Sequence, residues 1–233
     1  MDSQRRARKC RFLVRSLGLI VVSAALLGLA GCDFLFEPGL ETQYIVAYEE
    51  EFVDPASYAG DHAWGTSDTA EATTWVANGA LQIAVHTDDF FRASRPTGVV
   101  AGDDFRLDAG VCLVAGSSSA EVGVIFRVQD NWDHLRFTLS KDGRMRFRRR
   151  VSSSWTTLVD WTSCPSANEG TDCNVITVVA NGSRFDFYVN EEWVLQGFDS
   201  TLEGGGIGVV ATAAVGEPGT HGGFPIVILS EPL

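Results

Sequence analysis

From Tyr44 onward, apolar side chains recur at every second position of the chain. Val122, Val124 and Phe126 alternate with other residues in one run, and residues 134–140 repeat the pattern. A period of two places alternate side chains on one face of a β-strand, whereas an amphipathic helix needs a period of 3.6 residues. The alternation therefore predicts strands, and no convincing helical period follows Tyr44.

The alternating runs are separated by short turn sequences, among them Asn78-Gly79, Lys141-Asp142-Gly143 and Asn181-Gly182. Asn-Gly and Asp-Gly pairs between alternating runs are typical of β-hairpins. About a dozen short strands with a turn every 8–12 residues are typical of a sandwich, a barrel or a jelly roll. The pattern predicts a single all-β domain over residues 44–233.

The chain begins with a different pattern. Residues 1–15 contain six basic residues and one acid, and residues 16–31 carry no charge. A basic head followed by a short apolar run and small residues is the pattern of a secretory signal peptide. Sixteen residues are short for a membrane span, which needs about 20. An uncleaved helical anchor is the alternative interpretation.

The end of the apolar run, Leu29-Ala30-Gly31-Cys32, resembles the lipobox of bacterial lipoproteins. The resemblance implies cleavage before Cys32, a diacylglyceryl group on its thiol and an acylated new amino terminus. More than one acyl chain is needed because a single chain holds a protein on a membrane only marginally. We therefore expect a signal peptide at 1–31, a lipidated tether at 32–43, and export to the bacterial cell membrane or outer membrane.

Charge excludes one class of function. The whole chain has a net charge of −12, with 18 basic and 30 acidic residues. Removal of residues 1–31 takes away six basic residues and one acid, which leaves 12 basic residues, 29 acids and a net charge of −17. Because nucleic-acid binding depends on neutralising phosphates, this excess of acid excludes a general nucleic-acid binder.

Three cysteines follow Cys32. Cys164 and Cys173 flank a loop with proline and glycine, and in an exported protein they are candidates for a disulfide. A metal site is the alternative, although no third or fourth ligand lies near them in the sequence. Cys112 has Val111 and Leu113 as neighbours, so we expect it to act as a small hydrophobe in a buried strand.

Eight of the 12 basic residues after residue 31 lie between residues 127 and 150. Alternation places Arg144, Arg146 and Arg148 on the face opposite Met145 and Phe147. It places Arg136 opposite Phe137 and Leu139, and Arg127 opposite Phe126, which predicts a ladder of arginines on the outer face of one sheet. Guanidinium groups bind carboxylates, phosphates and sugar hydroxyls, and tryptophans offer stacking platforms. The candidate ligand residues are Arg127, Arg136, Arg146, Arg148, Trp132 and Trp155. The alternative is a solvated face whose arginines pair with the many acids.

Several segments together resemble the concanavalin A-like lectin/glucanase superfamily: VGVIFRVQDNWDHLRFTLSKDGRMRFRRR, NVITVVANGSRFDFYVNEEWV and GGGIGVVATA. The chain is most similar to its bacterial extracytoplasmic members of the laminin-G and 3-keto-glycoside hydrolase kind. The resemblance implies an antiparallel two-sheet jelly-roll sandwich. These motifs describe hairpins and sheet packing, so they support a fold more strongly than a function.

The resemblance brings no catalytic residues with it. Laminarinase-type members carry E-x-D-x-x-E or E-x-D-x-E on one strand, and that spacing is absent here. We expect a non-catalytic binding module for a glycan or an envelope polymer. The alternatives are an enzyme of the 3-keto-glycoside hydrolase type, or a structural envelope lipoprotein with protein partners.

No cofactor is predicted apart from structural calcium, which many jelly rolls of this superfamily hold. Its candidate ligands are Asp88, Asp89, Asp103, Asp104, Asp130 and Asp133, although no loop matches a defined calcium pattern.

Overall fold

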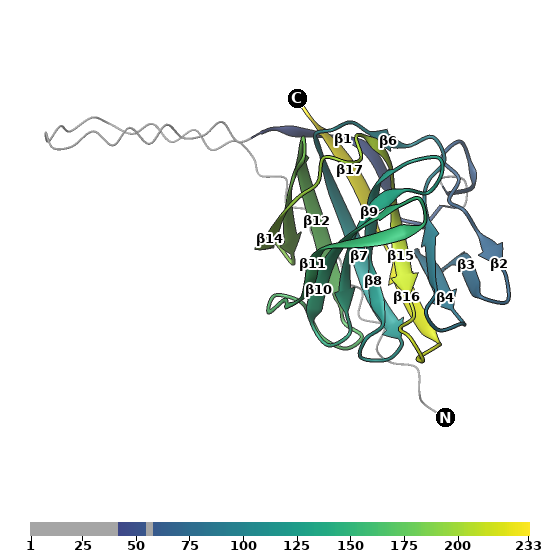
Figure 1. Ribbon diagram of the computed structural model, residues 1–233. Coiled ribbons are helices and arrows are strands. Elements are labelled where there is room, and N and C mark those ends of the chain that lie inside the picture. Colours follow the sequence, from purple (N-terminus) through teal and green to yellow (C-terminus); the bar gives the residue numbers. More distant parts are fainter. Residues whose placement is uncertain (1–41, 55–57) are drawn as a thin grey trace, which may run out of the picture. The chain divides into compact units, whose positions relative to one another are not determined.

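Alternating apolar residues fold residues 42–54 and 58–233, the part of the chain that the computed structural model describes, into two facing β-sheets (Figure 1). Every pairing between neighbouring strands is antiparallel within this part of the chain. The predicted all-β, two-sheet antiparallel sandwich is confirmed. The signal peptide, Cys32 and the start of the tether lie outside the described residues.

The larger sheet is built around the long strand β7 (Phe105–Ala115). Its strand order is β14 (Glu192–Phe198), β13 (Arg184–Val189), β12 (Cys173–Asn181), β7, β16 (Thr220–Phe224), β4 (Ala80–Val85), β3 (Ala72–Ala77) and β2 (Ser67–Asp68). Off this path, β17 (Val227–Pro232) pairs with β7 and with β1 (Tyr44–Glu50).

The smaller sheet carries most of the arginines. Its strand order is β11 (Ser154–Ser163), β10 (Arg144–Val151), β9 (His134–Ser140), β8 (Glu121–Val128), β15 (Gly205–Thr212) and β5 (Phe91–Ser94), with β6 (Val100–Ala101) paired to β15.

No helix of the described residues is long and apolar enough to cross a membrane.

The hairpin predictions are confirmed where the sequence has Asn-Gly or Asp-Gly. Asn78 and Gly79 join β3 to β4 with φ angles of 56° and 70°. Both angles are positive, as a type I′ turn requires, and its twist matches that of the flanking strands. Gly143 lies in the turn between β9 and β10, and Gly182 in the turn between β12 and β13.

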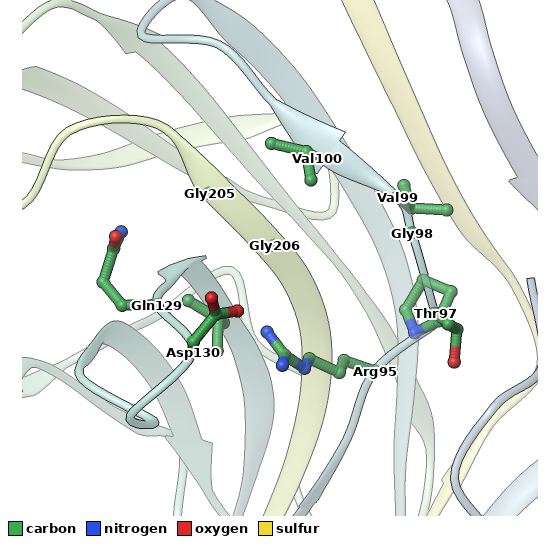
Figure 2. Close-up of a pocket in the computed structure, with 11 residues that line it drawn as sticks. Arg95, Thr97, Gly98, Val99, Val100, Gln129, Asp130, Gly205 and Gly206 are labelled. Atoms are coloured by element: carbon green, nitrogen blue, oxygen red, sulfur yellow. The ribbon is translucent and has the colours of Figure 1, made fainter.

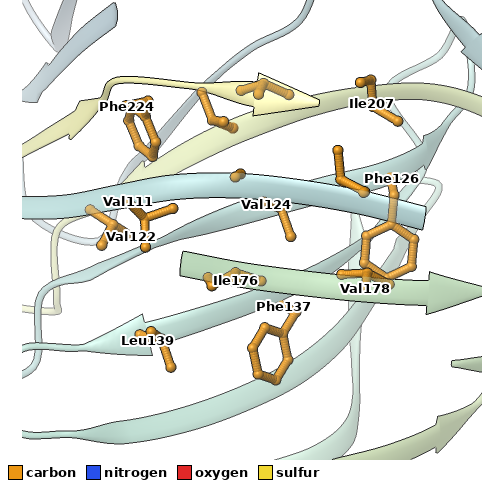
Figure 3. Packing of buried hydrophobic residues seen from close by; sticks show 14 of the residues in the cluster. Val111, Val122, Val124, Phe126, Phe137, Leu139, Ile176, Val178, Ile207 and Phe224 are labelled. Atoms are coloured by element: carbon orange, nitrogen blue, oxygen red, sulfur yellow. The ribbon is translucent and has the colours of Figure 1, made fainter. Parts of the chain in front are cut away.

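The inner faces of the two sheets meet in one hydrophobic core (Figure 3). Phe126 and Phe137 of the smaller sheet pack against Phe185 and Phe187 of the larger sheet. The rings of Phe137 and Phe187 stack with centroids 4.4 Å apart. Such aromatic pairs contribute about 0.5–1.5 kcal/mol beyond the burial of their surface, and they fix how the two sheets face each other.

One strand of the larger sheet, β16, does not have alternating apolar residues. It contains Gly222 and Gly223 and lies between β7 and β4. A Cβ at Gly222 would lie 2.8 Å from Cγ1 of Val122 in the facing sheet. Glycine is required there because the two sheets approach closely.

The disulfide prediction is wrong. Cys112 of β7 and Cys173 of β12 are direct register partners, with Cα atoms 4.2 Å apart, and they form the disulfide. Both side chains lie on the outer face of the larger sheet, since Cys112 alternates with Val111 and Leu113, which are buried in the core. Cys164 instead packs into the core and forms no disulfide with the other cysteines of the described residues. Cys112 is therefore a bonded cysteine rather than a buried hydrophobe.

Loss of the Cys112–Cys173 bond should destabilise the domain strongly. The bond closes a loop of 61 residues, so the double substitution Cys112→Ser with Cys173→Ser should lower the free energy of unfolding by about 4 kcal/mol in the chain-entropy model. Urea unfolding of the oxidised and reduced proteins measures this.

Cys164→Ala is the matched control, and its stability should still fall when a reductant is added. If Cys164→Ala removes the effect of the reductant, Cys164 belongs to the bond and this pairing is wrong.

Candidate functional site

The predicted arginine ladder lies on the outer face of the smaller sheet. Arg148 of β10 is directly opposite Arg136 of β9, and Arg146 is opposite Thr138. Met145 and Phe147 alternate with them and are buried in the core. Residues directly opposite in an antiparallel pair lie close together on one face, so two like charges meet at Arg136 and Arg148.

A buried carboxylate compensates part of this charge. Glu121 of β8 accepts a hydrogen bond from Thr138 Oγ1 at 2.7 Å and another from Nη2 of Arg146. Nη2 of Arg136 lies 3.8 Å from Oε2 of the same carboxylate. Arg136 and Arg146 are thus partly neutralised from within the protein, as the solvated-face alternative expected for such arginines.

Trp155 of β11 covers the ladder instead of standing open to solvent. The guanidinium carbons of Arg136 and Arg148 each lie 4.3 Å from the centre of its ring. The ring also contacts His134 and Phe91 edge to face. A cation over an aromatic face is stabilised by about 0.5–2 kcal/mol. Trp155 therefore packs with the arginines, and Arg136 is left only 1% exposed.

Arg148 is the member of the ladder without an internal partner. Among the described residues the guanidinium of Arg148 has no hydrogen bond and no ion pair, and its Nε atom is buried without a partner. Burial lowers the pKa of Arg148, against the opposing effect of Glu121 and Asp89. The guanidinium rests only on Trp155, so its donors remain available.

Arg127 does not join the ladder, and its predicted place was wrong. The register between β8 and β15 shifts near Arg127, whose φ angle is 51°, and this bulge turns its side chain off the outer face. Its guanidinium donates to the backbone carbonyls of Leu202, Asp103 and Gly182 and lies over the ring of Phe185. Arg127 therefore holds loops together.

An open trough runs beside this covered face, along β5. Three hollows of about 330, 340 and 440 Å³ share lining residues and so lie side by side. The first two share Arg92, Ala93 and Trp132, and the second and third share Arg95 and Thr97. We call this joined hollow the β5 trough. Its third part is also lined by Gly205 and Gly206 of β15.

Trp132 is the aromatic residue exposed in the trough. Its ring is 40% exposed and carries the guanidinium of Arg95 5.0 Å from its centre. Trp132 N–H donates to Gln129 at 3.0 Å, and its carbonyl accepts from His134 Nδ1 at 2.8 Å and from Arg150 Nη1 at 3.1 Å. These bonds fix the backbone from which the indole extends.

The backbone of Trp132 is also strained, with a φ angle of 62°. In this left-handed region, the contact of the Cβ with the backbone raises the conformational energy of a residue by roughly 1–2 kcal/mol. Such strain persists where the surroundings impose it, and it concentrates at functional sites. The conformation presents a large ring to solvent at a position that glycine or asparagine would occupy more easily.

Figure 2 shows the far end of the trough, where Arg95 extends across β15 at Gly206 toward Asp130. Nη1 of Arg95 lies 3.3 Å from the place that a Cβ of Gly206 would take. The bare backbone of this glycine therefore leaves room for the guanidinium. Asp130 is the acid that lines this hollow, and Gln129 closes its side by donating to Arg127, Glu203 and Gly204 carbonyls.

The structure thus divides the predicted ligand residues. Arg136, Arg146, Arg148 and Trp155 come together on the outer face of the smaller sheet. Trp132 lies in the trough, whereas Arg127 binds backbone carbonyls of loops. Sequence reasoning missed Phe91, Arg92 and Arg95. β5 is only four residues long and has no clear alternation, so periodicity could not find it. The arginine pair around FRASR was the available signal.

The aspartates proposed for calcium mostly serve the backbone. Asp88 accepts from Gly216 N–H, Asp103 from Gly204 N–H, Asp104 from Gly182 N–H, and Asp133 from Ser152 N–H. In residues 42–54 and 58–233 no group of three or more potential metal-ligating side chains gathers. The carboxylates are spread along the loops and stabilise turns there.

Comparison with known proteins places this geometry in a known fold. No protein-family model and no curated protein matches the sequence. Among solved structures, the carbohydrate-binding module CBM66 from Bacillus subtilis is similar, with a TM-score of 0.56 and 14% identity over 69% of this chain and 91% of that one. The described domain has the concanavalin A-like jelly-roll fold.

Two further structures share this jelly roll. The Bacillus licheniformis β-glucanase has a TM-score of 0.57 and 8% identity over 78% of this chain and 96% of that one. A protein of unknown function with a galectin-like fold from Bacillus subtilis has a TM-score of 0.56 and 10% identity over 82% and 100%. Identities this low establish the jelly roll alone, and function has to be argued from the site.

His134, which supports Trp132, gives the site a measurable pH dependence. The pKa of His134 is lowered to about 4, chiefly by burial and also by the charges of Arg150 and Arg148, while the bond to Trp132 and the charge of Asp133 act in the opposite direction. The folded protein therefore binds fewer protons than the unfolded chain between pH 6.5 and 4. The free energy of unfolding should fall by about 3 kcal/mol as the pH drops through this window.

Urea unfolding between pH 7.5 and 4 measures this dependence. His134→Asn is the control because its amide nitrogen can replace Nδ1 and does not titrate. The variant should lose the extra fall in stability below pH 6.5, and equal slopes in the two proteins would contradict a neutral His134.

Proposed function

We propose that this protein is an exported, lipid-anchored binding protein that holds a glycan in the β5 trough. The observation that carries the proposal is Trp132, an exposed indole on a hydrogen-bonded stretch of backbone at the wall of an open hollow. Sugars present apolar faces that stack on such rings, and few precisely placed polar groups then fix their orientation. Arg95, Arg150 and Asn131 are the polar groups that line the trough beside Trp132.

The jelly-roll fold supports a carbohydrate ligand. One of the similar structures is called a carbohydrate-binding module and another a β-glucanase. The site favours binding over hydrolysis, because hydrolysis usually needs two carboxylates about 5–10 Å apart across the scissile bond. On the arginine face Glu121 is buried and engaged by Arg146 and Thr138. A carboxylate held in that way is a poor acid or nucleophile.

Export and anchoring rest on the sequence before Tyr44. The basic head, the short apolar run and the Leu29-Ala30-Gly31-Cys32 segment support a lipid on Cys32. The Cys112–Cys173 disulfide supports an oxidising compartment, where such bonds persist. A binding domain tethered to a membrane would hold envelope or external polymer close to the cell.

Trp132→Ala should weaken glycan binding by at least about tenfold, because a central tryptophan in an interface often contributes about 2 kcal/mol. The melting temperature should change little, since the side chain is exposed. A screen of neutral and acidic polysaccharides against the full chain in detergent, by affinity electrophoresis and then calorimetry, measures both quantities.

Trp193→Ala is the matched control, because Trp193 is 57% exposed on β14 of the larger sheet. It should bind like the native protein. If the two variants weaken binding equally, the ligand does not lie in the trough.

Cys32→Ser tests the anchor. The substitution removes the thiol that would carry the lipid, so the protein should move from the membrane pellet to the soluble fraction, and labelled palmitate should no longer be incorporated. Cys10→Ser is the matched control within the leader, and it should leave both properties unchanged. Membrane association of Cys32→Ser equal to that of the native chain would favour an uncleaved helical anchor.

A further inference from the structure

We infer that the glycan of the β5 trough is acidic, and that its carboxylate or sulfate groups bind Arg92, Arg95, Arg148 and Arg150. The inference deepens the proposed function and rests on it. Some basic residues of the protein form ion pairs with acids and others do not, and the fold alone does not dictate which.

The 12 basic residues that follow residue 31 all lie in the described part of the chain, and they divide into two equal groups. Six form ion pairs with acids: Arg106, Arg136, Arg144, Arg146, Arg149 and Arg184. The other six have no ion pair among the described residues. Two of these, Arg127 and Lys141, donate to backbone carbonyls that fix loops.

The four that remain gather in one place. Arg92, Arg95 and Arg150 line the β5 trough. Arg148 lies against Trp155, whose ring contacts Phe91 on the wall of the same trough. In a chain with 29 acids against 12 basic residues, a carboxylate partner is abundant. Four arginines left without one at a single hollow indicate that the partner comes from outside.

Their hydrogen-bonding capacity is largely unused. A guanidinium has five N–H donors, yet Arg92 donates only to Thr69, and Arg150 only to the Trp132 carbonyl and Ser153. In the described part of the chain the guanidinium groups of Arg95 and Arg148 make no hydrogen bond, although Arg95 lies over Trp132 and Arg148 over Trp155. The Nε atoms of Arg92 and Arg148 are buried without a partner. Planar forks with free donors match carboxylate and sulfate oxygens best.

The ladder beneath Trp155 adds positive charge. Arg136 and Arg146 share one carboxylate, that of Glu121, and Arg148 beside them has no ion pair among the described residues. Arg136 is almost completely buried, and its Nε atom has no partner. Opposed like charges destabilise a sheet, and a bound anion beside Arg148 would relieve that repulsion. Asp130 lies at the far end of the trough beyond Arg95, so the acidic groups bind on the side of Arg95 that faces Arg92, Arg148 and Arg150.

The test uses matched polymers that differ in charge alone, with the full chain in detergent. Polygalacturonate is compared with its methyl ester, and dextran sulfate with dextran. Calorimetry should give at least about tenfold tighter binding to one or both acidic polymers, with the gap shrinking as salt screens the charges. A gap in the first pair alone identifies a carboxylate ligand, and in the second pair alone a sulfated one.

Arg92→Gln and Arg148→Gln should each lower affinity for the preferred acidic polymer by about tenfold. Each should change affinity for the neutral partner by less than about twofold, because a glutamine keeps one donor and loses the charge. Arg184→Gln is the control, since Arg184 is exposed and paired with Asp186 on the larger sheet. Unchanged melting temperatures confirm that the variants fold.

Equal binding to the acidic and neutral polymers would overturn the inference and leave the proposed glycan function standing. Polyglutamate binding as tight as that of the acidic glycans would also overturn it, since charge without sugar would then suffice. Binding to none of the four glycans would overturn the inference and the proposed function together.

Discussion

Strands β8 and β9 are buried along their whole length, although only one face of their sheet meets the hydrophobic core. On the second face, Trp155 of β11 covers arginines of β9 and β10, and Ile125 and Val128 of β8 pack with Val210, Phe91 and Ala93. This cover is stable because the carboxylate of Glu121 lies within it and binds Arg146 and Thr138. Buried guanidinium groups without such an acid would be strongly destabilising.

That cover decides where a ligand can bind. The centre of the outer face is filled by the Trp155 stack, so the open volume lies beside it, along β5. The loop that carries Trp132 connects the two regions, since its carbonyl accepts from both His134 and Arg150. The covered face therefore acts as the rigid support of the trough, which is how binding residues on loops are kept in place.

The sequence contained the strands and their inward faces because burial imposes a period of two, which long strands such as β9 and β10 display. It did not reveal deviations from regular strands. The bulge at Arg127 reverses that side chain, glycine replaces apolar residues in β16, and β5 is too short for a period. The Cys112–Cys173 bond depends on the register of β7 and β12, which are 61 residues apart at this pair. Only the assembled sheet sets that distance.

The same limit explains why alternation indicates the face of Arg136, Arg146 and Arg148 but not the partners of these side chains. Alternation places a side chain on a face, but an ion pair depends on which strand comes next to it. Glu121 reaches Arg146 because β8 and β10 both flank β9. Within residues 42–54 and 58–233, no acid forms an ion pair with Arg92, Arg95, Arg148 or Arg150 in the same way. A protein this acidic keeps them unpaired at a cost in stability, and such a cost is typical of residues that serve a ligand.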